Sequence, residues 1–233
     1  DECVRAWLIE EGAIRPTRAA LSFRLLVAFY NWTEEQKDYK GLIPEGAVSA
    51  RKVRDEVPTV QSKEGDCLQR EQVSVWFDGM RKLSNPVVSV YLQALFLTGA
   101  RRAELQGIRW KDVDFRWQTL ILRDKVEGER VIPLTPYVAH LLNLLPRRNE
   151  WVFSSPTAVD GKLSDPYHAH TRAVRAAGLP HLTLHGLRRS FGTLAEWVEM
   201  PTGVVAQIQG HKPSAIAEKH YRRRPVDLLR MWH

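Results

Sequence analysis

Residues 35–66 restrict the possible fold more than any other part of the chain, because they combine many charges with few apolar side chains. The stretch is punctuated by three glycines and two prolines, Gly41, Pro44, Gly46, Pro58 and Gly65. This composition is typical of a linker between folded units. We therefore predict a domain boundary here, with a helical unit and its linker over residues 1–62 and a second unit over residues 66–233.

Composition excludes several classes of protein. The chain has 233 residues, of which 44% are hydrophobic, so it can bury a core rather than remain disordered. Its 34 basic residues exceed its 27 acidic ones, and the net charge of +7 favours a polyanionic partner such as nucleic acid or an anionic membrane. The longest apolar run, residues 86–97, is well short of the ~20 residues that cross a bilayer. We therefore expect no membrane span.

Cysteine usage points to a reducing compartment. Cys3 and Cys67 form no Cys-x-x-Cys pair and have no ligand-like spacing to a histidine. Neither a disulfide framework nor a zinc site is therefore predicted, and a cytosolic location is expected. The chain starts at Asp1 with no initiator methionine and no leader-like segment, so we also expect upstream sequence to be missing.

Apolar residues repeat every three or four positions through most of the chain, which predicts helices. The predicted helices are two within residues 1–33, then residues 69–82, 85–97, 101–106, 137–145, 165–177, 184–198, 202–209 and 214–223. Gly99 is predicted to end one of them, and Thr183 to cap the start of another. Residues 117–123 and 130–134 are rich in β-branched, aromatic and leucine residues and flank a turn, which predicts a β-hairpin. The expected fold is mostly α-helical with a small antiparallel β-sheet.

Five polar motifs follow one another along the second unit. They are Thr98-Gly99-Ala100-Arg101-Arg102-Ala103-Glu104-Leu105, then Lys125 at the hairpin, His185-Gly186-Leu187-Arg188, Gly210-His211-Lys212, and Tyr221 ten positions after His211. In this order and spacing, over residues 68–221, they resemble the signature of the tyrosine recombinase (phage integrase) family. Several motifs in order are a far more specific signal than a single short one.

The resemblance implies a tyrosine recombinase catalytic fold, preceded by a partial helical core-binding domain. It also implies a catalytic site without a metal, another cofactor or ATP. The site residues that it implies are Arg101, Lys125, His185, Arg188, His211 and Tyr221. We further expect basic residues beside these motifs to hold the DNA backbone, namely Arg102, Arg189, Lys212, Arg222 and Arg223.

The chemistry of phosphodiester cleavage supports this choice of residue types. Charge on the non-bridging oxygens must be stabilised as attack proceeds, and without a metal this requires fixed cations. Guanidinium groups remain charged and match two phosphate oxygens at once, so Arg101 and Arg188 would form a clamp. His185 and Arg188 are three residues apart and share a helix face. Another face of the same helix is predicted to pack, through Leu187, Phe191, Leu194 and Val198.

Tyr221 would be the nucleophile, but a phenol with a pKa near ~10 is barely ionised at neutral pH. His185 and His211 are therefore candidates for the group that accepts its proton. The resemblance implies that attack yields a 3′-phosphotyrosine and a free 5′-hydroxyl, and we assign Lys125 as the acid that protonates the latter. Covalent catalysis of this kind preserves the energy of the phosphodiester.

Alternatives exist for most of these residues. Arg102 is an equally basic neighbour of Arg101, although the Thr-Gly-x-Arg spacing selects Arg101. Glu104 is expected to orient an arginine or a backbone amide rather than to do chemistry. The alternatives to Lys125 are Lys111 and Arg130, and the alternatives to Tyr221 are Tyr137 and Tyr167. Trp110 and Trp117 are expected to anchor the core rather than to stack on bases.

The resemblance implies a site-specific DNA recombinase, such as the integrase of a phage or genomic island. Its partners would be double-stranded DNA at attachment sites, further copies of itself in a tetramer that exchanges strands pairwise, and DNA-bending accessory proteins. It would act in the cytoplasm at the nucleoid of a bacterium. The alternatives are a type IB topoisomerase, a catalytically inactive DNA-binding regulator with the same fold, and, as a weaker third, a nuclease.

Overall fold

In a computed structural model of the chain, the described residues are 2–59, 65–124, 128–211 and 224–233. The chain divides into two compact units, Asp1–Glu64 and Gly65–His233. Among the helices of these described ranges, none combines the length and the hydropathy that a bilayer crossing requires.

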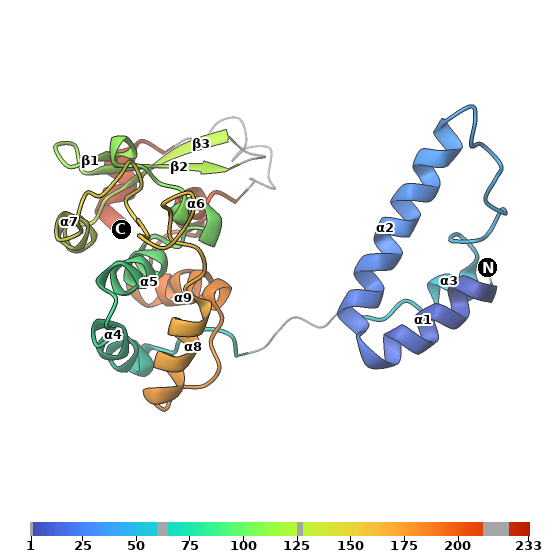
Figure 1. The fold of residues 1–233 in the computed structure, drawn as a ribbon, viewed down its shortest axis with the longest axis horizontal. Helices are drawn as coiled ribbons and strands as arrows, with labels where there is room; N and C mark the ends of the chain where they lie inside the picture. The colour runs from blue at the N-terminus through green and yellow to red at the C-terminus, as the bar shows by residue number, and fades with distance from the viewer. Residues whose placement is uncertain (1, 60–64, 125–127, 212–223) are drawn as a thin grey trace. The chain divides into compact units, whose positions relative to one another are not determined.

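The first unit is built on a helical hairpin. Helices α1 (Glu2–Ile14) and α2 (Pro16–Glu35) pack against each other, and the short α3 (Arg51–Arg54) lies against α1 (Figure 1). Their common core consists of Leu8, Phe23, Val48 and Val53. Glu56 accepts two hydrogen bonds from the guanidinium of Arg5 on α1, at 3.1 and 3.0 Å.

The prediction that residues 35–66 form a linker is wrong for part of that stretch. Val48 and Val53 are only 4% and 0% exposed, because α3 returns to cover α1. This stretch has few apolar residues, but burying them against α1 is more favourable than leaving the segment extended in water. At the other end of the stretch, the side chain of Asp66 is buried in the second unit.

The second unit places a small sheet at one end and groups several helices at the other (Figure 1). Its strands β1 (Val113–Asp114), β2 (Thr119–Asp124) and β3 (Gly128–Pro133) are antiparallel in the order β1-β2-β3. Its α-helices are α4 (Val73–Arg81), α5 (Pro86–Thr98), α6 (Arg102–Gln106), α7 (Pro136–Asn143), α8 (Tyr167–Ala176), α9 (Leu184–Ala195), α10 (Thr202–Gln209) and α12 (Val226–Trp232). Three 3-10 turns are also described, η1 (Arg70–Gln72), η2 (Trp110–Asp112) and η3 (Glu196–Val198).

This architecture confirms the predicted fold class and the β-hairpin. Strand β1 was not predicted, because a two-residue strand has no readable periodicity. Helix α12 was also missed. The predicted helix over residues 214–223 lies outside the described residues.

Helix α5 forms the centre of the second unit and is buried on nearly every side. Asn85 caps its start, with the side-chain oxygen accepting from the backbone N–H groups of Val87 at 3.0 Å and Val88 at 3.4 Å. Pro86 follows as the first helical residue, where its missing N–H costs nothing. Gly99 ends the helix in the left-handed conformation with φ of 56°.

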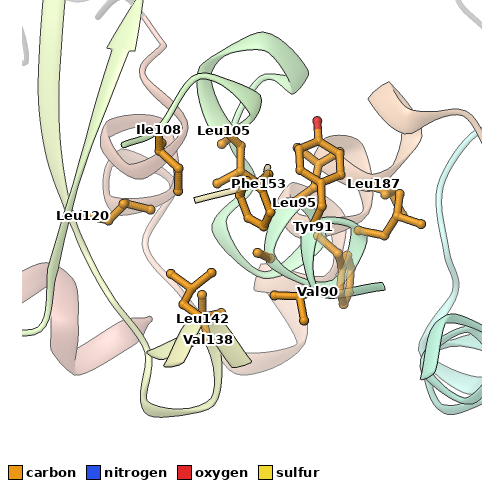
Figure 2. Packing of buried hydrophobic residues seen from close by; sticks show 14 of the residues in the cluster. Val90, Tyr91, Leu95, Leu105, Ile108, Leu120, Val138, Leu142, Phe153 and Leu187 are labelled. Atoms are coloured by element: carbon orange, nitrogen blue, oxygen red, sulfur yellow. The ribbon is translucent and has the colours of Figure 1, made fainter. Parts of the chain in front are cut away.

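The core joins α5 to the sheet and to α7 (Figure 2). Tyr91 and Leu95 of α5 lie near Phe153, whose ring meets that of Tyr91 edge-on at a centroid distance of 5.0 Å. Leu105 of α6 and Leu120 of β2 complete this side of the cluster. The helix that starts the site motif and the sheet that carries the hairpin are therefore packed into one core.

Two predicted packing positions are wrong. Trp117 is 65% exposed, because it lies in the tight turn between β1 and β2, where Asp114 accepts hydrogen bonds from the Arg116 and Trp117 amides at 2.9 Å. Trp110 does pack against the core. Val198 is 60% exposed, because α9 ends at Ala195 and the following 3-10 turn rotates Val198 away from the packed face.

We expect Gly99→Ala to destabilise the second unit by about 2–5 kcal/mol, from overpacking of ~1–3 kcal/mol and left-handed strain of ~1–2 kcal/mol. A Cβ atom at Gly99 would lie 2.6 Å from Cδ1 of Phe191. Urea denaturation measures this loss. Gly178→Ala is the matched control, since φ is +68° there but nothing lies within 4 Å, so it carries the strain alone. Equal losses in the two variants would contradict the clash.

Candidate active site

The start of α9 positions two of the predicted site residues. Thr183 caps the helix by accepting a hydrogen bond from the Gly186 amide at 2.9 Å. Its own amide and hydroxyl donate to the carboxylate of Asp66, at 2.8 and 2.7 Å. This arrangement fixes the first turn of α9, which carries His185 and leads to Arg188.

Arg189, a predicted DNA contact, takes part in the same arrangement. Its Nη1 lies 2.6 Å from Oδ2 of Asp66, whose carboxylate is almost fully buried. The structure thus places Arg189 in an ion pair that anchors the start of the second unit to α9.

Arg188 is buried, at 5% exposure, where three elements meet. Its Nη1 donates to the carbonyl oxygens of Gly99, at the end of α5, and Gln209, at the end of α10, both at 2.8 Å. The Gln209 side chain donates back to the Arg188 carbonyl at 2.8 Å. A buried cation held by carbonyl dipoles on both sides has a fixed position.

Arg101 follows the Gly99 turn and caps α6. Its Nη1 donates to Glu104 at 2.8 Å and to Asp124 at 3.1 Å, and its Nη2 donates to the carbonyl of Gly210 at 3.2 Å. The side chain is 35% exposed, so this guanidinium reaches the surface. The Thr-Gly-x-Arg motif is thus explained locally, since the glycine turns the chain and the arginine starts the next helix.

Glu104 organises the arginines, as predicted. Its carboxylate accepts from the Arg101 amide at 2.9 Å as well as from the Arg101 side chain. It also accepts a forked pair of bonds from Arg130 of β3, at 3.0 and 2.6 Å. Burial alone would raise the pKa of this carboxyl, but the hydrogen bonds from Arg130 and Arg101 outweigh it and hold the pKa below its usual range.

His185 lies at the edge of a pocket of about 320 Å³. The pocket is lined by Ala100, Arg102, Tyr167, Thr183, Leu184, His185 and Arg188. Partial desolvation, together with the positive charges of Arg189 and Arg188, lowers the pKa of His185. The imidazole is therefore neutral near pH 7 and able to accept a proton.

His211 directly follows the end of α10. Gly210 has φ of +70° there, and the His211 amide donates back to the Ala206 carbonyl at 2.8 Å. His211 itself is exposed. The Gly-His sequence thus turns the chain out of the helix beside the carbonyl that binds Arg101.

The other predicted residues are placed as follows. Arg102 is half-exposed and pairs with Asp165 at 3.3 Å. Tyr137, an alternative nucleophile, donates to the Gln93 side chain at 2.7 Å, whereas Tyr167, the other alternative, lines the pocket. Lys125, Lys212, Tyr221, Arg222 and Arg223 lie outside the described residues. The structure therefore brings together Arg101, Arg188, His185 and His211.

Sequence reasoning missed the contribution of Arg130, which it treated only as an alternative to Lys125. A signal was available in the hairpin pattern, because Arg130 shares a strand face with Ile132, two positions further on, whose side chain is fully buried. No local pattern, however, reveals that its partner is Glu104, 26 positions earlier. Across the described residues, no group of three or more His, Cys, Asp or Glu side chains is arranged to hold a metal ion.

Comparison with known proteins agrees with this geometry. The model of the phage integrase family matches residues 68–226, and that of the phage integrase core-binding domain matches residues 1–55. The chain belongs to the phage integrase family. The prophage integrase IntF of Escherichia coli K12 is 56% identical over 237 residues, which cover 99% of this chain and 51% of IntF. The tyrosine recombinase XerC of Corynebacterium glutamicum is 27% identical over 203 residues, covering 82% of this chain and 63% of XerC.

Solved structures of the phage integrase family share the fold. A lambda integrase(75-356) dimer bound to a COC′ core site matches with a TM-score of 0.73 at 17% identity, covering 96% of this chain and 81% of that one. The site-specific recombinase XerH, bound to its difH substrate, matches with a TM-score of 0.69 at 17% identity, covering 99% of this chain and 66% of XerH. The predicted tyrosine recombinase fold is confirmed. This integrase-family chain spans about half the length of IntF.

We expect Glu104→Gln to lower the free energy of unfolding by about 3 kcal/mol at pH 7, because it leaves the largely buried guanidinium of Arg130 without its counter-charge. The folded-state pKa of Glu104 is lowered, so its stabilisation is present above the unfolded pKa of about 4.3 and is lost as pH falls through the folded value. Wild type should therefore lose more stability than the variant on acidification below about pH 4.3, measured by urea titration.

The control for Glu104→Gln is Glu150→Gln. Glu150 pairs with Arg109 at 3.2 Å, but its side chain is 57% exposed. A pair of this kind contributes at most about 1 kcal/mol. Equal pH dependence of wild type and Glu104→Gln would rule out the buried pair as its source.

Proposed function

We propose that this chain carries the catalytic part of a site-specific DNA recombinase, which cuts and rejoins DNA through a 3′-phosphotyrosine without a metal or ATP. The observation that carries the proposal is the convergence of Arg101 and Arg188 on the end of α10. Their guanidiniums bind the neighbouring carbonyls of Gly210 and Gln209, next to His211. Two fixed cations beside a histidine are what a metal-free phosphodiester site requires.

Arg101 and Arg188 bind the non-bridging oxygens of the scissile phosphate. Each guanidinium has five N–H donors, so it can share them between the protein groups that hold it and a phosphate. Their charges stabilise the transition state, and their contacts to carbonyl and carboxylate oxygens keep them in place before DNA arrives. Little reorganisation is then needed at the moment of attack.

Tyr221 attacks the phosphorus through its phenolic oxygen. The bond from phosphorus to this oxygen forms as the bond to the 5′-oxygen breaks, and the phenol proton passes to the neutral His185 or to His211. Lys125 protonates the leaving 5′-oxygen. Rejoining is the reverse attack by a 5′-hydroxyl, so the bond energy is conserved.

The DNA partner is a duplex attachment site held by both units, residues 1–62 and 66–233. Backbone contacts come from Arg102, Arg189, Lys212, Arg222 and Arg223. Four copies exchange strands pairwise, with DNA-bending accessory proteins, in the bacterial cytoplasm at the nucleoid. The known structure of a lambda integrase tetramer bound to a Holliday junction supports this assembly. The names of the relatives support recombination over topoisomerase or purely regulatory roles.

A trapping assay tests the proposal. The chain is incubated with a pool of random-sequence duplexes nicked near each potential cleavage point, so that the short 5′-hydroxyl fragment diffuses away and rejoining cannot occur. We expect a denaturant-resistant protein–DNA adduct, with binding that weakens steeply as salt rises, by about 0.9 counterion per neutralised phosphate. Sequencing of the trapped DNA then identifies the preferred site.

Other outcomes point to other functions. A free 3′-phosphate without an adduct would indicate a nuclease. Relaxation of supercoiled DNA without exchange of ends would indicate a topoisomerase. Binding that does not respond to salt would contradict the proposed DNA contacts.

A further inference from the structure

Three consecutive carbonyl groups at the end of α10 each accept a hydrogen bond from a different arginine. The carbonyl of Ile208 binds Nε of Arg130 at 3.0 Å, whereas the next two bind Arg188 and Arg101, at 2.8 and 3.2 Å. The last carbonyls of a helix have no partner within it and carry the negative end of its dipole. The three guanidiniums satisfy them together.

Arg130 also binds the carboxylate that orients Arg101. Its two terminal nitrogens donate to the two oxygens of Glu104, at 3.0 and 2.6 Å. The same carboxylate accepts a hydrogen bond from Nη1 of Arg101 at 2.8 Å. The side chains of Arg130 and Glu104 are only 16% and 3% exposed. Arg130 is therefore less exposed than Arg101, whose side chain is 35% exposed.

The guanidinium of Arg130 also fills the space where a side chain at Gly210 would lie. A Cβ atom at Gly210 would lie 2.7 Å from Nη1, 2.8 Å from Cζ and 2.9 Å from Nε of Arg130. Contact with all three atoms means that the guanidinium lies against the backbone of Gly210. The next residue is His211, so Arg130 supports the point where the chain turns toward the site.

We propose that Arg130 is a positioning residue for DNA cleavage, which holds the end of α10 and the Glu104 carboxylate so that Arg101 and His211 meet the phosphate. The inference rests on the proposed function. The charges also support the proposal, because Arg130 places a second positive charge beside the Glu104 carboxylate. The carboxylate then offsets less of the positive potential around Arg101 than it would if Arg101 were its only partner. Arg130 is a poor candidate for the acid that replaces Lys125, since a guanidinium does not give up its proton in a protein.

The test is the single-turnover cleavage rate of Arg130→Ala on the trapping substrate, at saturating protein and below the unfolding temperature. We expect the rate to fall about 10- to 100-fold, as for a misplacement of reacting groups by ~1 Å. DNA affinity should stay within about twofold of wild type, since Arg130 makes no phosphate contact in this scheme. Arg130→Lys should recover only part of the rate, because an ammonium cannot reproduce the fork.

Arg123→Ala is the matched control. Arg123 lies on the neighbouring strand β2, and it pairs with the buried carboxylate of Asp112 and with Glu129 rather than with Glu104. This variant also loses a pair between an arginine and a buried carboxylate, from a more exposed arginine than Arg130, and it should cleave at the wild-type rate. Thermal unfolding of both variants gives the fraction folded, so that rates are compared per folded molecule.

A double-mutant cycle with Arg101→Ala shows whether Arg130 acts through Arg101. If it does, loss of Arg130 should cost clearly less in the Arg101→Ala background than in wild type. Fully additive effects, or an Arg130→Ala rate equal to wild type, would overturn the inference while the wild-type adduct upholds the proposed function. Absence of an adduct from wild type itself would overturn both.

Discussion

We expect Tyr221→Phe to reduce covalent adduct formation to background while leaving DNA affinity unchanged within about twofold. Phenylalanine keeps the ring and removes only the oxygen that would attack phosphorus, so no covalent bond to DNA can form at this position. The measurement is the trapping assay, with peptide mapping of the wild-type adduct to residue 221.

Two other tyrosines provide controls for Tyr221→Phe. Tyr167 lines the pocket beside His185 and Arg188, and Tyr137 is hydrogen-bonded to Gln93. Both Tyr167→Phe and Tyr137→Phe should form the adduct. An adduct that survives in Tyr221→Phe and disappears in Tyr167→Phe would move the nucleophile to the pocket.

The second large effect is expected at Arg188. Replacement by alanine should slow cleavage by about 10²- to 10³-fold, the usual cost of removing one donor that stabilises transition-state charge. The variant should also be less stable, because the carbonyls of Gly99 and Gln209 lose their donor, at about 1–3 kcal/mol for each buried group left unsatisfied. Single-turnover rates are therefore measured below the unfolding temperature of the variant.

Comparison with Arg101→Ala separates the slower cleavage expected of Arg188→Ala from its lower stability. The guanidinium of Arg101 is 35% exposed, so its loss should slow cleavage comparably but cost less stability. Arg188→Lys provides a further control, because it keeps the charge and loses the planar fork. Cleavage at the wild-type rate by Arg188→Ala would remove this residue from the proposed clamp.

The residues of the proposed site were predictable because each belongs to a short motif. Thr98 to Glu104, His185 to Arg188, and Gly210 to His211 are contiguous, and each coincides with the end or start of a helix that caps and glycines mark locally. The structure brings their described members together, as the motif order implied. The catalytic roles of all these residues, and of Lys125 and Tyr221, stay predictions, as do the domain boundaries and the DNA contacts.

Errors arose where burial depends on distant parts of the chain. Val48 and Val53 were predicted to be linker residues, because the sequence around them gives no indication that they pack against α1. Trp117 is hydrophobic, yet the turn around Asp114 projects it into solvent. A tertiary partner decided the burial of Val48 and Val53, whereas the turn geometry decided the exposure of Trp117.

The sequence by itself determined most of the helices, the hairpin, the charge and the family, since these depend on propensities and motifs spanning a few residues. Only the tertiary structure decided that Arg101, Arg130 and Arg188 share the end of α10. The bond from Arg101 to Gly210 joins residues 109 positions apart, and that from Arg130 to Ile208 joins residues 78 apart. Contacts of such separation form because the packed core brings their elements together, and no local pattern encodes them.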